Sequence, residues 1–316
     1  MEVAPGIHRI QTPFGDRFVC LYLLVGSEAA LLVDTGVDAT PGEYLAPYLD
    51  EIGLAVDKIR YVINSHADFD HTAGNQSAKE LCPGALFMCH RSDLGQVEDI
   101  ELMISDRYGE YAQDHGIADG DEALDAIRAA TRTCPIDIAL AGGEAIRLGP
   151  EWSIDIWHTP GHSYGHLSLY DPRGHHLIIA DAALYNAVLT ADGAPAFPPT
   201  YRYVDTYLAS AQRIAAVRPN LLLTSHYPVY EGAAAAEFMA ESRAFVDRVD
   251  QALIKALASE RTLKELTDLL APDLGAWPAE AGAYACFPFL GHLERLVQYG
   301  RAQTDRRDGL LTYRLK

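Results

Sequence analysis

The stretch "NSHADFDHTAGN", at positions 64–75, constrains the fold of this chain more than any other segment. It follows the apolar run "IRYVI", which predicts a buried strand. Four side chains that can ligate a metal ion then lie within six positions: His66, Asp68, Asp70 and His71. Because they begin the loop at the end of a strand, a rigid sheet can aim them into one cleft. Imidazole and carboxylate groups are preferred ligands of divalent transition metals, so the stretch predicts a metal site.

Three more predicted strands end in a residue of the same chemistry. They lead to His162 in "TPGHSYGH", Asp181 in "IIAD" and His226 in "LLLTSH". Any one of these residues alone would more often be a hydrogen-bonded polar group at a strand end than a ligand. Together with the opening stretch they make seven, and two metal ions with a bridging water need about seven ligands. The set therefore predicts a centre of two divalent metal ions.

The order of the predicted elements indicates an α/β fold in two parts. Over residues 1–236, strands and helices alternate in two similar halves, which predicts two β-sheets packed face to face with helices outside. A helical segment at 91–136, rich in acids and tyrosines, is either a lid-like insertion that forms a substrate wall or a solvated flap. Residues 237–316 read as three amphipathic helices and a hairpin with a turn at Asp308 and Gly309. This small α+β region resembles a winged helix.

The metal-ligand motifs, in this order and spacing, resemble the metallo-β-lactamase superfamily over residues 1–236. The resemblance implies the αββα sandwich of that family. It also implies that Asp34, in "LLVDTG", supports the metal loop from behind the ligands, and His166 is a candidate for a similar supporting role. The implied assignment is His66, residue 68 and His162 for the first metal, Asp70, His71 and His226 for the second, and Asp181 as the bridge between them.

Position 68 departs from the pattern of the family. Most hydrolases of the superfamily have H-x-H-x-D-H, whereas this chain has H-x-D-x-D-H. With Asp68 as a ligand, two dications, three carboxylates and one hydroxide carry no net charge, which predicts a less acidic bound water and a shift of preference from zinc towards iron or manganese. The flavodiiron oxygen reductases of the same superfamily look similar, since they also place a carboxylate here. The alternative is that Asp68 turns away and leaves a centre with one metal ion.

The resemblance implies a hydrolase of the glyoxalase II-like and lactamase-beta-like branch. In this hypothesis a metal-bound hydroxide attacks an ester, thioester or lactone of a small molecule, and Asp70 also orients the hydroxide. A tyrosine near the metals could donate to the oxyanion or the leaving group. Three tyrosines closely follow a ligand, namely Tyr164, Tyr185 and Tyr227, and the catalytic candidates are Tyr185 and Tyr227. Tyrosines at strand ends more often keep the hydroxyl in water.

Two other functions compete with this one. An RNA-processing metallohydrolase would use the winged-helix-like tail to bind nucleic acid, and a di-iron redox enzyme would explain Asp68. The formal net charge of −19 opposes a polyanion: residues 237–316 hold 11 basic and 12 acidic residues, so about −18 lies in the rest of the chain. The flavodiiron enzymes rely on a flavin-binding domain, and the tail has no Gly-rich phosphate loop. We therefore expect a small-molecule substrate, with the tail as a packing or homodimer-forming module.

The remaining composition favours a cytoplasmic protein with reduced thiols. The start "MEVAPGIHRI" has neither the basic residues nor the apolar core of a signal peptide, and no apolar stretch is long enough for a membrane span. The five cysteines are scattered and outside any C-x-x-C pair, which argues against disulfides and a thiolate zinc site. We expect neither nucleic acid nor a membrane among the partners.

Overall fold

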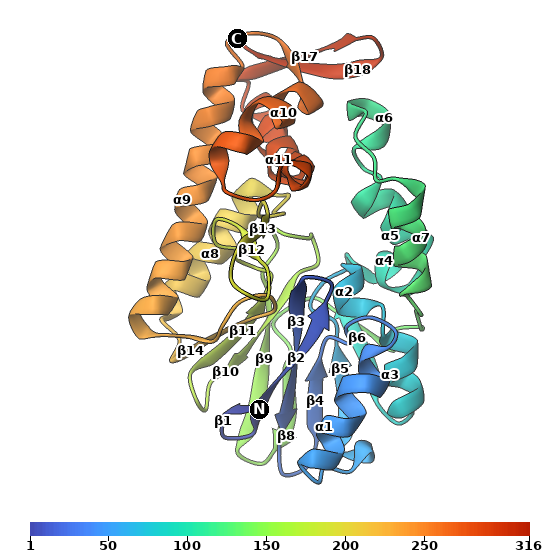
Figure 1. The fold of residues 1–316 in the computed structure, drawn as a ribbon. Helices are drawn as coiled ribbons and strands as arrows, with labels where there is room; N and C mark the ends of the chain where they lie inside the picture. Colours follow the sequence, from blue (N-terminus) through green and yellow to red (C-terminus); the bar gives the residue numbers. More distant parts are fainter.

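Two β-sheets face each other in the computed structural model, which describes residues 1–316 (Figure 1). The first sheet has seven strands in chain order: β1 (Glu2–Ala4), β2 (Ile7–Phe14), β3 (Arg17–Val25), β4 (Ala30–Val33), β5 (Ile59–Ile63), β6 (Leu86–His90) and β7 (Ile138–Leu140). The second has six, in the spatial order β15 (Tyr230–Glu231), β14 (Leu221–Thr224), β11 (His176–Ala180), β10 (Leu167–Asp171), β9 (Trp152–His158) and β8 (Ala145–Gly149). Apolar side chains from both sheets, such as Tyr22, Leu31, Ile156 and Leu169, form the core between them.

Helices cover the outer faces of both sheets. On the first sheet these are η1 (Pro41–Leu45), α1 (Ala46–Glu51) and α3 (Asn75–Leu81), and the short turns η2 (Val56–Lys58) and α2 (Phe69–Thr72) flank β5. Leu45 and Leu49 pack there against Leu32. On the second sheet, Ile214 of α8 (Val204–Val217) packs against Leu222. The arrangement confirms the predicted αββα sandwich.

Parallel pairing brings the ligand-bearing segments to one edge of the sandwich. β4, β5 and β6 are parallel neighbours in the first sheet, and β11 and β14 are parallel neighbours in the second. The carboxyl ends of parallel strands lie at the same edge of a sheet, where ligands commonly bind. The loop from β9 to β10 returns to that edge as well, because β10 is antiparallel to β11.

The segment between β6 and β7 is helical, as the sequence predicted. It contains α4 (Leu94–Glu98), α5 (Ile100–Met103), the π-helical turn η3 (Ile104–Tyr108), α6 (Ala112–His115) and α7 (Asp121–Ala129). We call this segment the insertion. Its far end contacts the C-terminal hairpin, where Asp114 Oδ1 lies 2.6 Å from Arg306 Nη2. The insertion therefore connects the sandwich to the C-terminal part of the chain.

The C-terminal part consists of helices and a small sheet (Figure 1). Its elements are α9 (Gly232–Ala256), β16 (Arg261–Thr262), α10 (Leu263–Leu274), η4 (Ala279–Ala285), α11 (Cys286–Gln298), β17 (Ala302–Arg307) and β18 (Leu310–Leu315), with the strands in the order β16-β18-β17. Asp308 and Gly309 both have positive φ, as a two-residue hairpin turn requires. The likeness to a winged helix stays a prediction. The predicted boundary at 236/237 lies inside α9, whose alanine-rich start favours a helix that continues across it.

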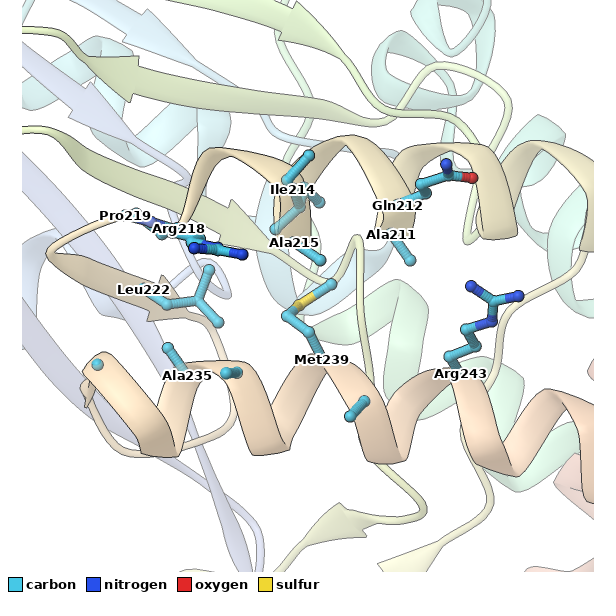
Figure 2. Close-up of a pocket in the computed structure, with 14 residues that line it drawn as sticks. Ala211, Gln212, Ile214, Ala215, Arg218, Pro219, Leu222, Ala235, Met239 and Arg243 are labelled. Carbon is cyan, nitrogen blue, oxygen red and sulfur yellow. The ribbon is translucent and has the colours of Figure 1, made fainter.

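A groove lies between α8 and α9 (Figure 2). It has a volume of about 910 Å³ and is lined by small side chains such as Ala211 and Ala235, with Arg218 and Arg243 towards its two ends. None of the predicted ligands lines this groove. The candidate functional site is therefore a different pocket, which is described together with the ligands below. None of the helices combines the length and apolarity that crossing a membrane requires.

Candidate metal centre

The seven predicted ligands meet at the edge of the sandwich in two groups. We call His66, Asp68 and His162 the first triad, and Asp70, His71 and His226 the second triad. Within each triad, one donor atom of every residue lies within 4.8 Å of the other two. His66 and His71 also form such a group with Asp181. The grouping matches the assignment that the family resemblance implied.

Asp181 stands between the two triads. Its Oδ2 lies 3.9 Å from Nε2 of His66, 3.7 Å from that of His71, 4.0 Å from that of His162 and 3.2 Å from that of His226. Two ligands of one tetrahedral zinc ion, each at about 2.1 Å from the metal, are about 3.4 Å apart. The separations suit a carboxylate shared by two metal sites.

Each histidine of the cluster directs Nε2 inward because its Nδ1 is bonded elsewhere. The Nδ1 atoms lie 2.9 Å from Ser65 Oγ for His66, 2.8 Å from Asp34 Oδ2 for His71, 3.1 Å from Thr200 O for His162 and 2.9 Å from Phe18 O for His226. The Nε2 atoms of His66 and His71 are buried and have no hydrogen-bond partner. An Nδ1–H bonded to an oxygen leaves the Nε2 lone pair free, which is how metal-binding histidines are commonly oriented.

The cluster holds more negative than positive charge. Its charged groups are the carboxylates of Asp34, Asp68, Asp70 and Asp181 and the guanidinium of Arg107, a net of −3 when the imidazoles are neutral. Burial raises the pKa of Asp181, but His226 and His71 outweigh it and hold this pKa well below its usual range. Burial lowers the pKa of His71, but Asp70 and Asp34 raise it to about 10. Buried carboxylates require cations, so this donor set fits divalent metal ions.

Asp68 faces the cluster. Its Oδ2 lies 2.8 Å from Nε2 of His162 and 3.6 Å from Nε2 of His66. The alternative in which Asp68 turns away is not what the structure shows. Burial raises the pKa of this carboxyl, but the charge of Arg107 holds it well below its usual range.

Asp34 supports the ligand loop as the resemblance implied. It is almost fully buried and follows β4. Its Oδ1 accepts a hydrogen bond from the backbone N–H of Ser65 at 2.7 Å, and its Oδ2 accepts from Ser65 Oγ at 2.8 Å in addition to His71 Nδ1. Asp34 thereby fixes both the start of the loop and the orientation of a ring in the second triad.

A second buried carboxylate, Asp93, was missed by the sequence analysis. Its Oδ2 accepts from the backbone N–H of Ala67 at 3.2 Å and from Ser163 Oγ at 2.7 Å, and its Oδ1 accepts from the backbone N–H of Gly165 at 2.7 Å. A Cβ at position 165 would lie 2.4 Å from this carboxyl, so only glycine fits there. Asp93 joins the two loops of the first triad. It follows β6 at the same sheet edge, so the strand-end rule would have found it.

The insertion contributes two further side chains that were missed. Arg107 is buried, and its Nε and Nη2 donate to the two oxygens of Asp68 at 2.8 and 3.1 Å. The hydroxyl of Tyr108 accepts from the backbone N–H of Phe69 at 3.2 Å and lies 3.5 Å from Asp68 Oδ1. Both residues belong to η3, and π-helical turns are frequent at functional sites.

The tyrosine candidates do not reach the cluster. The hydroxyl of Tyr227 is fully buried and donates to Leu184 O at 2.6 Å and to Ala187 O at 2.9 Å, and burial raises its pKa well above the usual range. Tyr185 stacks on Phe238 behind the second sheet. Tyr164 is largely exposed. The predictions for Tyr185 and Tyr227 are corrected: the strand-end position brings a tyrosine near the edge, but both rings pack against Phe238 instead of lining the pocket at the cluster.

His166 lies behind the cluster. Its Nε2 accepts from the backbone N–H of Asp181 at 3.2 Å, its Nδ1 lies 3.0 Å from Thr159 Oγ1, and its ring stacks on His66 at 5.0 Å. Burial lowers its pKa well below the usual range, so the ring stays neutral. These contacts agree with the supporting role expected from the sequence.

A pocket of about 480 Å³ has the cluster in its lining. Five of the seven ligands border it, namely Asp68, Asp70, His162, Asp181 and His226. Apolar walls come from five separate parts of the chain. These are Phe14 of β2, Phe69 of α2, Tyr108 of the insertion, Val188 and Phe197 of the hairpin β12 (Val188–Leu189) and β13 (Pro195–Phe197), and Tyr284 and Phe287 of the C-terminal part. Two arginines line the pocket, Arg107 beside Asp68 and Arg17 with its guanidinium 4.7 Å from the ring centre of Phe197.

The family of this chain follows from a direct comparison. A family model described as the metallo-beta-lactamase superfamily matches residues 15–226, a range that holds all seven ligands. The chain belongs to the metallo-beta-lactamase superfamily.

Solved structures with the same fold include two bacterial proteins. A metallo-beta-lactamase family protein from Thermus thermophilus has a TM-score of 0.77 at 22% identity, with 100% of both chains covered. A beta-lactamase domain protein from Burkholderia ambifaria has a TM-score of 0.78 at 20% identity, with 100% of this chain and 94% of that chain covered. At these identities the likeness shows the fold alone, and it extends over the C-terminal part.

A curated relative is more similar in sequence over a shorter range. The hydroxyacylglutathione hydrolase of Nitrosococcus oceani is 25% identical over 130 residues, which cover 41% of this chain. The match spans 35% of that relative's length.

Proposed function

We propose that this protein is a metal-dependent hydrolase that cleaves an ester, thioester or lactone bond in a small molecule. The observation that carries the proposal is that carboxylates and imidazoles of both triads border an apolar-walled pocket. Two divalent ions would be held by the seven ligands. Zinc is the first candidate, and iron or manganese are alternatives because Asp68 adds an oxygen donor.

The residues of the cluster would have different roles in metal binding and catalysis. Bound divalent ions supply Lewis-acid chemistry, because they lower the pKa of water and polarise a carbonyl group. The first triad would hold one ion, the second triad the other, and Asp181 both. Asp70 lines the pocket with Oδ2 3.5 Å from His226 Nε2, so it is placed to accept a hydrogen bond from the attacking water. Tyr108 replaces the earlier tyrosine candidates, because it lines the pocket with its hydroxyl 3.5 Å from Asp68 Oδ1. Burial raises the pKa of its phenol, so the hydroxyl keeps a proton to donate.

The pocket favours a substrate with an apolar acyl or alcohol part. Its aromatic walls would bury that part, while the scissile carbonyl would lie at the cluster. The partial similarity to a hydroxyacylglutathione hydrolase supports hydrolysis of an acyl compound. The net charge of −19 gives no support to a nucleic-acid substrate, so we expect a small molecule.

The test is a panel of p-nitrophenyl esters, acyl thioesters and lactones, offered to the zinc-loaded full chain. We expect hydrolysis of at least one class, loss of that activity after treatment with a chelator, and recovery when zinc is restored. Protein with its full metal content that hydrolyses none of the three classes would contradict the proposal. Oxygen consumption by iron-loaded protein would favour the redox alternative instead.

A further inference from the structure

Arg107 binds Asp68 through two hydrogen bonds, one to each oxygen of the carboxylate. Nε lies 2.8 Å from Oδ1, and Nη2 lies 3.1 Å from Oδ2. A guanidinium that binds both oxygens of a carboxylate fixes the plane of that carboxylate as well as its position. Each carboxylate oxygen has two lone pairs. Arg107 takes one on Oδ2, and the other side of this oxygen faces the first triad, where Nε2 of His162 lies 2.8 Å away.

The same guanidinium also contacts His162 but does not donate to the free lone pair on Nε2 of its ring. Nη1 donates to the backbone oxygen of His162 at 3.1 Å. Nη2 lies 3.1 Å from Nε2 and 3.5 Å from Nδ1 of the ring. An atom on the lone-pair axis of one ring nitrogen would be much farther from the other, so these similar distances place Nη2 beside the ring. The lone pair of Nε2, freed by the bond from Nδ1 to Thr200 O, stays directed into the first triad.

The surroundings of Arg107 hold it in this one position. Its side chain is 8% exposed, and the guanidinium lies 4.8 Å from the ring centre of Phe287 on α11. A buried guanidinium needs a carboxylate partner, and Asp68 is the one that it has here. Helix α11 and the insertion therefore place a permanent positive charge against the first triad.

This charge changes the balance that the sequence predicted. Asp68 adds one negative charge where the usual motif of the family has a neutral histidine, and Arg107 adds one positive charge at the same place. The centre then has the net charge of the histidine version. The expectation of a less acidic bound water loses its basis, because it counted Asp68 without Arg107.

We propose that Asp68 and Arg107 act together as one neutral ligand unit, in which Arg107 orients the carboxylate and cancels its charge so that the pair replaces a histidine at position 68. Arg107 is then a positioning residue of the first triad. The inference rests on the metal centre of the proposed function but not on any particular substrate.

The test measures zinc binding to the full chain, by elemental analysis for the number of ions and by competition with a chromophoric chelator for the affinity. We expect two ions in the unaltered protein. Arg107→Met should weaken binding at the first triad about 10–100-fold, because the carboxylate loses the partner that orients it. Asp68→His should weaken it similarly, because a buried guanidinium is left beside neutral donors. The double variant Asp68→His/Arg107→Met should regain both ions with nearly the original affinity.

Arg202→Met is the matched control. Arg202 is also buried, but its partners are Glu110 and Glu294, outside the cluster, so zinc affinity should not change. Thermal unfolding of the zinc-free proteins separates a folding defect from a binding defect. If neither single variant folds, the double variant alone tests the proposal. Two tightly bound ions in the double variant would support the proposal, and fewer than two would contradict it.

Three results would overturn the proposal. Unaltered zinc affinity in Arg107→Met would make the arginine irrelevant to the first triad, and losses that simply add in the double variant would mean independent roles. A single ion in the unaltered protein would mean that Arg107 takes the place of the first ion. Because zinc binding needs no substrate, an inactive hydrolysis panel would leave the result on the pair intact, whereas protein that binds no zinc would contradict both proposals.

Discussion

The two triads use the same kinds of donor but are held by different parts of the molecule. The histidines of the second triad are held by the sandwich: His71 is bonded to Asp34 at the end of β4, and His226 to the backbone of β3. The first triad depends on the insertion as well, because Arg107 binds both Asp68 and the backbone of His162. Sheet edges fix one half of the centre, and a segment added between β6 and β7 completes the other half.

This difference shows how a superfamily fold can change one metal site while it keeps the other. A strand end cannot move without disturbing the core, so donors fixed there tolerate little variation. An insertion is free to vary, and here it supplies the counter-charge for a changed ligand. The predictions that follow test whether the two halves respond separately.

Removal of a ligand of the second triad should have the largest effect. Asp70→Ala should reduce activity to the level of the metal-free protein and release one ion, because it removes both a donor and the group placed to orient the attacking water. Elemental analysis and the hydrolysis panel measure the two effects. The exposed Asp57→Ala serves as the control, and full activity with a normal metal content in Asp70→Ala would show that the assignment is wrong.

Loss of the support behind the second triad should have a smaller effect. Asp34→Asn keeps the shape of the side chain but removes the charge that the Nδ1–H of His71 and the two donors of Ser65 bind. Changes of this kind typically weaken metal binding about 10–100-fold. Zinc titration should show the larger loss at the second triad, because Asp34 contacts His71 directly but reaches His66 of the first triad only through Ser65. Asp57→Asn is the control. An equal loss at both ions would mean that the two halves are not separate.

The corresponding change on the side of the first triad is Asp93→Asn. It removes the carboxylate that joins Ala67 to Ser163 and Gly165, and the new amide would face two backbone N–H donors. We expect a loss of about 1–3 kcal/mol in the free energy of unfolding, measured in urea. The larger loss of zinc affinity should be at the first triad, the opposite of what we expect for Asp34→Asn. Two variants with their larger loss at the same ion would refute the division into triads.

Tyr227→Phe should have the smallest effect on activity. The variant loses the two hydrogen bonds to Leu184 O and Ala187 O, which costs about 1 kcal/mol of stability. The value of kcat should not change, because the hydroxyl does not face the pocket. Tyr108→Phe is the informative partner variant, since its hydroxyl lies beside Asp68. A large drop in kcat for Tyr227→Phe would restore the original sequence-based candidate.

The ligands could be predicted because each is a local feature of the sequence. An apolar run followed by His or Asp marks a strand end, and parallel pairing brings such ends together. The same logic gave Asp34, and it would have given Asp93 if the residues after "LFMCH" had been treated as a strand end. Where side chains follow the strand direction, the sequence pattern is sufficient.

The positions of Tyr185, Tyr227 and Arg107 could not be predicted from strand ends. Tyr185 and Tyr227 lie beside ligands in the sequence, yet their rings pack behind the second sheet with Phe238. Arg107 lies 39 positions after Asp68, in a helical segment without a recognisable motif. Proximity in the sequence was misleading in the first case and uninformative in the second.

The sequence by itself determined the superfamily, the sandwich and the identity of seven candidate ligands, because strand ends and motif spacing are local features of the sequence. Only the tertiary structure decided which side chains surround those ligands. Arg107 meets Asp68, and Phe287 meets Arg107, through contacts between the sandwich, the insertion and the C-terminal part. Such contacts depend on how whole elements pack, and packing is a property of the folded chain rather than of any stretch of its sequence.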